Sequence, residues 1–484
     1  MEARYDLPYD LAVIGGGVNG AAIARDAAGR GLSVLLLEGG DLGQGASSRS
    51  SKLIDGGLHH LEHGRLAQVA EALHEREILW HQAPHIVSPM RFVVPLVPEG
   101  RPWWMLRAGL WLYDRVGGRK VLPPTRKVRL EGRLGLQPSM RQGYEYSDCR
   151  VDDARLVVLL ARDAADRGAE VRCRRAVTSL RREGHLWRIG AGDELFYAAM
   201  VVNAAGAQVG QVMDMAQAAR PAPMRGVRGS HIVVPRLHED HRALLLQTDD
   251  GRVCFAMPWQ YAFTLVGMMN WDVAPDAMPS HVTEAEIAML LATANRHFRR
   301  QIGREDVMWN FVGAGVRAEG DQDKAEAYCL QSDRGSDRHS APLLSVIGGS
   351  LTTHRVLAEA ALERLGLADN AGWTATASLP GGDFTPDGLD DADYLAPLEQ
   401  EILAQAHGLS RATAHRLARA YGTEALRFVG GDMGRAIGQG FTEAELEHLV
   451  AREWAATVED VLWRRTKLGL WFSTEETAVL ASLL

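Results

Sequence analysis

The N-terminal part of the chain contains the sequence feature that most constrains its fold. The apolar run Leu11–Ile14 leads into G-x-G-x-x-G at Gly15, Gly17 and Gly20; a helical pattern and a second apolar run then end at Glu38. Glycines at this spacing allow a tight turn, a close approach of backbone to a pyrophosphate, and packing of helix against strand. An acid eighteen residues after the last glycine suits a hydrogen bond to a ribose hydroxyl. This order of elements predicts a Rossmann-like α/β domain that binds a dinucleotide at a helix N-terminus.

A second loop rich in glycine and serine, residues 43–52, follows this unit. Its backbone N–H groups and hydroxyls can bind the far half of a dinucleotide that begins at the first turn. The position of the motif at the very N-terminus and the presence of this loop favour FAD over NAD. The cofactor-binding residues predicted from this part of the chain are Gly15, Gly17, Gly20, Glu38, Ser47, Ser48, Ser51, Lys52 and Leu53.

The composition limits the class of protein. A chain of 484 residues, 46% hydrophobic and 24% charged, is expected to be globular with two or three domains. The net charge of −8 argues against a nucleic-acid partner, for which a basic stripe is expected. The four cysteines form no C-x-x-C, which indicates a reducing compartment and no zinc or iron–sulfur site. Because the sequence shows neither a signal peptide nor eighteen consecutive apolar residues, we expect a cytoplasmic protein without a membrane span.

Longer runs of the sequence resemble the aerobic, FAD-dependent glycerol-3-phosphate dehydrogenases. The runs are GGGVNGAAIARDAAGRGLSVLLLE, SSKLIDGGLHHLEHG, EYSDCRVDDARL, RGSHIVVPR, GGSLTTHRVLAEAALERL and LWRRTKLGLW, and they cover nearly the whole chain in order. With the strand and helix patterns, the resemblance implies an FAD-binding domain, an inserted antiparallel β-sheet domain for the substrate, and an α-helical C-terminal cap. The expected ranges are 1–85, 145–215 and 335–380 for the FAD-binding domain, 86–144 and 216–334 for the substrate-binding domain, and 390–484 for the cap.

The resemblance also implies roles for residues far from the N-terminus. Two turns that follow predicted strands are expected beside FAD, and they contribute Ala205, Gly206, Gly349, Leu351 and Thr352. Flavin carries out the redox step, so the protein must orient the donor and accept its proton. By resemblance, His231 is the candidate general base and Arg317 holds or polarises the substrate oxygen.

The departures from the family pattern concern the residues that would bind a phosphate group. His59 and His60 stand in place of Arg-Tyr, Ser350 in place of lysine, and GMMN at residues 267–270 in place of GTTD; a further family arginine falls near Glu326. Each lost charge-assisted hydrogen bond removes on the order of 1.5–3 kcal/mol. The substitutions therefore predict a less cationic, partly more apolar pocket, lined by His59, His60, Met268, Asn270, Arg317 and Ser350.

The histidine cluster allows a second interpretation. His59 and His63 are spaced i and i+4, so on a helix they could share a metal, and with Glu62 they spell H-x-x-E-H. No third ligand is evident and the family site holds no metal, so no metal is expected.

The segment from Arg101 to Lys120 is a helix pattern in which tryptophans alternate with arginines, a composition typical of interfacial helices. Burial against the substrate domain explains the tryptophans equally well. The two interpretations stay open at this point; the resemblance implies a peripheral enzyme on the inner face of the cytoplasmic membrane that reduces quinone.

Three functions stay open at this point. The first is dehydrogenation of glycerol 3-phosphate or a diverged polyol, with quinone as acceptor. The second is oxidation of an amine or unphosphorylated polyol, with oxygen as acceptor, which Asp55 and Glu326 would favour if they face the pocket. The third is flavin binding without turnover. The sequence does not decide between these acceptors, nor whether the chain forms a homodimer.

Overall fold

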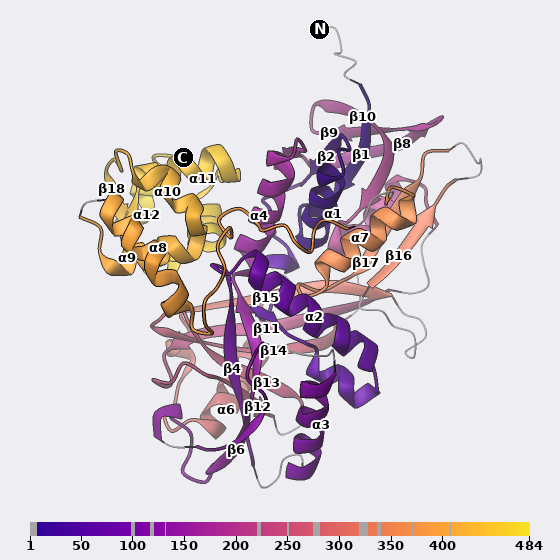
Figure 1. Ribbon diagram of the computed structural model, residues 1–484. Coiled ribbons are helices and arrows are strands. Elements are labelled where there is room, and N and C mark those ends of the chain that lie inside the picture. The colour runs from indigo at the N-terminus through magenta and orange to yellow at the C-terminus, as the bar shows by residue number, and fades with distance from the viewer. Residues whose placement is uncertain are drawn as a thin grey trace.

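The computed structural model describes residues 7–97, 102–116, 121–130, 132–219, 224–248, 251–273, 281–318, 328–335, 340–368, 372–406 and 408–484. Two large β-sheets organise this part of the chain (Figure 1). The first, which we call the parallel sheet, has the order β16-β17-β10-β1-β2-β7, and the hairpin of β8 and β9 extends from β10. Its strands are β1 (Tyr9–Ile14), β2 (Val34–Leu37), β7 (Glu170–Arg172), β8 (Val177–Glu183), β9 (Leu186–Ala191), β10 (Glu194–Asn203), β16 (Tyr328–Asp333) and β17 (Leu343–Gly348).

The centre of the parallel sheet is buried on both faces, as its continuous apolar strands predict. Leu11–Ile14 of β1 and all of β2 are buried. Three helices cover one face, α1 (Val18–Gly29), α4 (Asp153–Asp166) and α7 (His354–Leu365). The other face packs against α5 (Val209–Met215) and the β8–β9 hairpin. The carboxyl ends of β1, β10 and β17 therefore open toward one common edge, where the turns before α1, α5 and α7 meet.

The second sheet, which we call the antiparallel sheet, has the order β15-β11-β14-β13-β12-β4-β6-β3, and β5 pairs with β6. Its pairs are antiparallel except that β12 runs parallel to β4. Helix α6 (Glu284–His297) packs on one face, and α2 (Leu66–Gln82) and α3 (Trp103–Arg115) on the other. The strands are β3 (Leu53–Ile54), β4 (Val87–Pro95), β5 (Arg126–Arg129), β6 (Gln142–Val151), β11 (Met224–Pro235), β12 (Ala243–Gln247), β13 (Val253–Trp259), β14 (Phe263–Val273) and β15 (Trp309–Ala318).

The C-terminal region forms a mainly helical domain with its own hydrophobic core, drawn in orange to yellow in Figure 1. Its helices are α8 (Asp391–Gln405), α9 (Arg411–Tyr421), α10 (Leu426–Val429), α11 (Glu443–Glu453), a π-helix, η8 (Asp460–Arg465), and α12 (Thr474–Ala481). The sequence predicts no strand here, but β18 (Ala436–Gly438) and β19 (Phe441–Thr442) form a short antiparallel pair. These strands have only three and two residues, too few for an alternating pattern to be visible.

The structure also moves two expected domain boundaries. Strand β16 pairs with β17 at the edge of the parallel sheet, although residues 216–334 were assigned to the substrate domain. Strand β3 pairs with β6 in the antiparallel sheet, although residues 1–85 were assigned to the FAD-binding domain. A sequence pattern identifies a strand, but its partner is chosen by long-range pairing, which the pattern does not encode.

Candidate functional site

A long cleft of about 3440 Å³ runs between the two sheets. Ligand pockets usually enclose roughly 300–1,000 Å³, so this cleft has room for a dinucleotide and a substrate together. Its wall includes the turns after β1, β10 and β17, the loop after β2, and the face of the antiparallel sheet that α2 and α3 cover. In open α/β folds, ligands bind outside the carboxyl ends of the parallel strands, at the point where the strand order reverses.

The first turn has the geometry that a bound pyrophosphate requires. Gly15 has φ of +110°, a conformation that side chains rarely allow. A Cβ on Gly20 would lie 1.9 Å from the Gly15 carbonyl oxygen, so only glycine permits α1 to start this close to β1. The backbone N–H of Val18, at the start of α1, donates to Ser47 Oγ at 3.0 Å, so the serine loop lies against the helix N-terminus. Gly15, Gly17 and Ser47 line the cleft as predicted, whereas Gly20 is buried and acts through packing.

Glu38 lies at the end of β2 and lines the cleft. Its carboxylate accepts the N–H of Gly16 at 2.6 Å and the N–H of Gly40 at 2.7 Å. These bonds fix the carboxylate beside the first turn, where a ribose would lie. A contact between Glu38 and that ribose stays a prediction.

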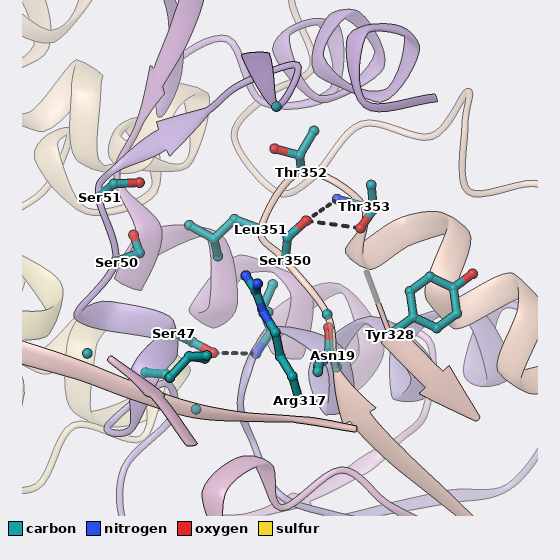
Figure 2. Close-up of a pocket in the computed structure, with 18 of the residues that line it drawn as sticks. Asn19, Ser47, Ser50, Ser51, Arg317, Tyr328, Ser350, Leu351, Thr352 and Thr353 are labelled. Atoms are coloured by element: carbon teal, nitrogen blue, oxygen red, sulfur yellow. Dashed lines mark hydrogen bonds between the residues drawn. The ribbon is translucent and has the colours of Figure 1, made fainter. Parts of the chain in front are cut away.

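The third turn connects β17 to α7 and lies beside the start of α1 in the cleft wall. Gly348 and Gly349 have φ of +84° and +99°, and the amide of Asn19 donates to the Gly348 carbonyl at 2.9 Å. Figure 2 shows Leu351 and Thr352 in this turn, with Arg317 pointing from β15 toward it. The second turn, after β10, adds Ala205 and Gly206 to the same wall. Three segments far apart in the sequence thus meet around one cavity.

Besides Gly20, two predicted cofactor residues, Ser48 and Lys52, do not line the cleft. Lys52 is 3% exposed, and its Nζ binds both carboxylate oxygens of Asp153, at 2.9 and 2.7 Å, and the Ser48 carbonyl at 2.7 Å. Ser48 contributes this carbonyl but is not part of the cleft wall. A buried lysine needs a counter-ion, and Asp153 lies about a hundred positions along the chain, so the sequence could not reveal the pair. Ser51 and Leu53 do line the cleft.

The structure does not bring His231 to the cleft wall. Its ring is fully buried, stacked on Phe311 with centroids 4.6 Å apart and tilted against Phe255 at 5.7 Å. Phe255 lines the cleft, and His231 lies on the same face of the antiparallel sheet, over Gly267 between Phe311 and Phe255, without reaching the cleft wall itself. Burial, followed by the positive charge of Lys52, lowers the pKa of His231 to about 3. The imidazole is therefore neutral at pH 7, and its role as the proton acceptor stays a prediction.

The predicted substrate residues divide in the same way. His60, Arg317 and Ser350 line the cleft. Met268 is fully buried against α6, on the opposite face of the antiparallel sheet, so it does not make the pocket more apolar. The side chains of His59 and Asn270, and Glu326 as a whole, lie outside the described residues.

The histidine segment forms a 3₁₀-helix, η2 (Leu58–His63), rather than an α-helix. In a 3₁₀-helix, residues three apart lie on one face, and His60 and His63 both line the cleft. The pairing of His59 with His63 would require an α-helix, so it does not apply here. Within the described residues, no group of three potential ligands is placed to bind a metal ion.

The cleft is more cationic than the substitutions predict. Seven arginines line it among the described residues, against five carboxylates, Glu38, Asp55, Glu71, Asp148 and Glu363. The arginines are Arg49, Arg65, Arg225, Arg228, Arg252, Arg317 and Arg364. Several of these arginines lie on strands of the antiparallel sheet, where successive side chains point to opposite faces of the sheet. The cleft as a whole therefore keeps positive charge, while a less cationic donor end than the family pattern stays a prediction. A signal that was missed is Arg225, just before the GSHIVVP run; its neighbour Arg228 is ion-paired with Glu286 of α6 at 2.6 Å.

These features fit FAD, because three glycine-containing turns meet at one cavity and the first leaves no room for a Cβ. The comparisons with known proteins decide the family. The model of the FAD dependent oxidoreductases matches residues 10–333, and that of the C-terminal domain of alpha-glycerophosphate oxidase matches residues 373–483. A glycerol-3-phosphate dehydrogenase of Pseudomonas aeruginosa is 43% identical over 98% of this chain and 95% of its own length. The chain belongs to the FAD-dependent glycerol-3-phosphate dehydrogenase family.

Membership of this family makes the chain an FAD-dependent oxidoreductase with a small-molecule substrate. A D-erythritol 1-phosphate dehydrogenase of Brucella abortus is 42% identical over 97% of this chain and 96% of its own length. The fold is that of the glycerol-3-phosphate dehydrogenase from Bacillus halodurans, whose structure was solved with FAD, at a TM-score of 0.73 and 24% identity over 99% of this chain and 94% of that one.

Proposed function

We propose that this enzyme oxidises a secondary CH–OH group of a phosphorylated polyol. The relatives named above act on glycerol 3-phosphate and D-erythritol 1-phosphate, two donors that share a hydroxylated chain and a phosphate dianion. The substitutions at positions 59, 60 and 350 remove family contacts to that dianion. The arginines of the antiparallel sheet supply positive charge in their place.

The pair Arg225 and Arg317 carries this proposal. The two residues are directly opposite in the antiparallel ladder of β11 and β15, and both line the cleft. Residues opposite each other on one face have Cβ atoms about 5 Å apart, so the two side chains can reach one ligand. Two guanidinium groups on one wall offer several donors to a single anion, and arginine forks match phosphate oxygens. Arg317 also points toward the turn of Ser350 and Leu351 (Figure 2), so the phosphate and the flavin would share this wall.

His60 is the group that we propose to accept the donor's proton. It lies on η2, in the cleft wall, three residues after Gly57, whose N–H donates to Asp55 at 2.7 Å. Burial raises the pKa of Asp55; the hydrogen bond from Gly57 opposes that rise, and so would a proton on His60, because the two side chains are close enough to interact. An imidazole oriented by a carboxylate is a common general base. FAD, when bound, supplies the hydride acceptor.

For the acceptor we propose a membrane quinone, with helix α3 at the lipid surface. Trp103, Trp104 and Trp111 are 56%, 61% and 56% exposed, and Arg115 stacks on Trp111. Strand β5 adds the exposed Arg126 nearby, linked through the Thr125 N–H that donates to Asp114 of α3 at 2.8 Å. A basic, tryptophan-rich patch on a chain of net charge −8 is complementary to anionic lipids. The described helices are all too short or too polar to cross the bilayer.

The donor is tested by anaerobic bleaching of the bound flavin. We expect bleaching by glycerol 3-phosphate or erythritol 1-phosphate at lower concentration than by glycerol or erythritol. Arg225→Gln should raise KM for phosphorylated donors by roughly 10- to 100-fold, the loss of one charge-assisted contact. Arg304→Gln, the same charge change at an exposed ion pair with Glu284, is the control. Bleaching by unphosphorylated polyols or amines at equal or lower concentration would refute the proposal.

The membrane contact is tested by sedimentation with vesicles. The wild-type protein should sediment with vesicles that contain anionic lipid and less with neutral ones. Replacing both Trp103 and Trp104 by serine should reduce binding, whereas Met308→Ser, an apolar residue of similar exposure (55%) outside α3, should not. Equal binding by all three proteins would exclude α3 as the contact.

A further inference from the structure

The loop between β2 and the 3₁₀-helix η1 (Ala46–Ser48) forms part of the cofactor side of the cleft and is attached on its other side to the C-terminal domain. Gly39, Gly40, Gly43 and Gln44 line the cleft. Asp41, in the middle of the same loop, is 1% exposed and is absent from the cleft wall. Its side chain points instead into the C-terminal domain, where it meets two arginines.

Two consecutive residues of the π-helix η8 bind the Asp41 carboxylate. Arg465 donates from Nη1 to Oδ2 and from Nη2 to Oδ1, both at 2.7 Å, and Arg464 donates from Nε to Oδ2 at 2.5 Å. All three side chains are at most 6% exposed. A second contact connects the same segments, because Arg174 pairs with Asp460 of the π-helix and its backbone N–H donates to the Gly40 carbonyl at 2.9 Å.

The same loop is also hydrogen-bonded to the first glycine turn, so it connects this turn with the C-terminal domain. The N–H of Gly43 donates to the Gly16 carbonyl at 2.9 Å. Gln44 closes the loop on itself, since its backbone N–H donates to the Asp41 carbonyl at 3.0 Å and its Oε1 accepts the Asp41 N–H at 2.9 Å. Asp41 therefore lies two residues from a direct backbone contact with the turn that holds the pyrophosphate.

A carboxylate buried between two guanidinium groups is expensive to desolvate, and apolar packing would connect two domains at least as well. The charged cluster fixes an orientation that apolar packing would not fix. Charge-assisted hydrogen bonds to the guanidinium planes hold the Asp41 carboxylate, and with it the loop, in one orientation. π-Helical turns occur frequently at functional sites. Here the turn brings neighbouring arginines onto one acceptor.

We propose that the C-terminal domain retains the cofactor: Arg464 and Arg465 are positioning residues that hold the Asp41 loop against FAD. The effect is on binding of the adenosine half rather than on hydride transfer. This inference depends on FAD occupying the cleft and not on the identity of the donor.

The experiment compares two conservative variants of full-length protein. Arg465→Lys keeps the positive charge but loses the bidentate contact with Asp41. The matched control is Arg416→Lys, which alters a bidentate pair between the partly buried Arg416 and the buried Glu445, at 2.6 and 2.7 Å, within the same domain but away from the loop. Flavin is removed from each protein, folding of the apoprotein is checked by circular dichroism and thermal melting, and FAD is titrated back by fluorescence quenching.

We expect Arg465→Lys to raise the Kd for FAD about tenfold or more, and Arg416→Lys to change it by less than about twofold. The KM for the donor, measured at saturating FAD, should stay near that of the wild type in both. Equal changes in Kd for the two variants would overturn the proposal, because the effect would then be general destabilisation of the domain. If Arg465→Lys does not fold, Asp41→Asn, which changes one atom of the side chain, is titrated against the same control with the same criterion.

Discussion

Ser350 is the position at which a single substitution tests how the cleft recognises its donor. Its Oγ accepts the Thr353 N–H at 3.2 Å and lies 3.0 Å from Thr353 Oγ1, so the serine caps the turn before α7. The side chain also faces the cleft beside Arg317 (Figure 2). Ser350→Lys therefore removes a cap and adds a cation at the wall where we place the phosphate.

The two effects have different sizes and different readouts. Loss of the cap should lower the free energy of unfolding by about 1 kcal/mol. A new charge-assisted contact to phosphate contributes about 1.5–3 kcal/mol when it is buried. Because residue 350 is exposed to the cleft, screening by water favours the lower end of that range. We therefore expect KM for glycerol 3-phosphate to fall roughly tenfold, since about 1.4 kcal/mol corresponds to a factor of ten.

Steady-state kinetics with an artificial electron acceptor measure this change, with glycerol as the unphosphorylated control. Ser350→Ala is the matched variant, because it loses the cap without gaining the charge. It should show the same decrease in stability with KM unchanged. If KM for glycerol 3-phosphate is the same in the lysine and alanine variants, the phosphate does not lie beside position 350 and the assignment of this wall is wrong.

Three further predictions test other parts of the site. Gly20→Ala would place a Cβ 1.9 Å from the Gly15 carbonyl oxygen, so we expect a protein purified without flavin absorbance; retention of FAD would show that the turn can relax. Burial lowers the pKa of His354 to about 4, so between pH 6.5 and 4 the unfolded chain binds more protons there than the folded one. Its contribution to stability is thus complete above about pH 6.5 and falls by about 2 kcal/mol from pH 7 to pH 5. His354→Asn should remove that part of the pH dependence of the free energy of unfolding, measured with urea. If the pH dependence is the same in the variant and the wild type, the pKa of His354 is not lowered by burial. His60→Gln should lower kcat by about 10²- to 10⁴-fold if it accepts the proton, and a larger loss in His231→Gln would return the role to His231.

The sequence predicts a residue of this site when the motif that identifies the residue lies within one short stretch of the chain. Gly15, Gly17 and Glu38 are identifiable because strand, turn and helix lie within thirty residues and each glycine has its own steric reason. The turn at Gly349 is identifiable for the same reason, by a strand before it and a helix after it. The surroundings of His231 are not identifiable in this way, because its motif fixes its position on a strand but not the phenylalanines that pack on either side of it.

The charge of the cleft also depends on contacts between distant segments, which the sequence does not show. Substitutions at known positions predict a loss of positive charge, yet Arg225 and Arg317 meet across β11 and β15 and line the cleft. Their separation of ninety-two positions carries no sign of that contact.

The sequence by itself determined the Rossmann-like domain, the cofactor and the family, because these depend on short-range order and on backbone sterics at a few glycines. Only the tertiary structure decided which side chains face the cleft and that a C-terminal arginine pair holds the cofactor loop. The physical reason is that strand register and helix packing orient these side chains, and both are set by contacts between segments distant in the chain.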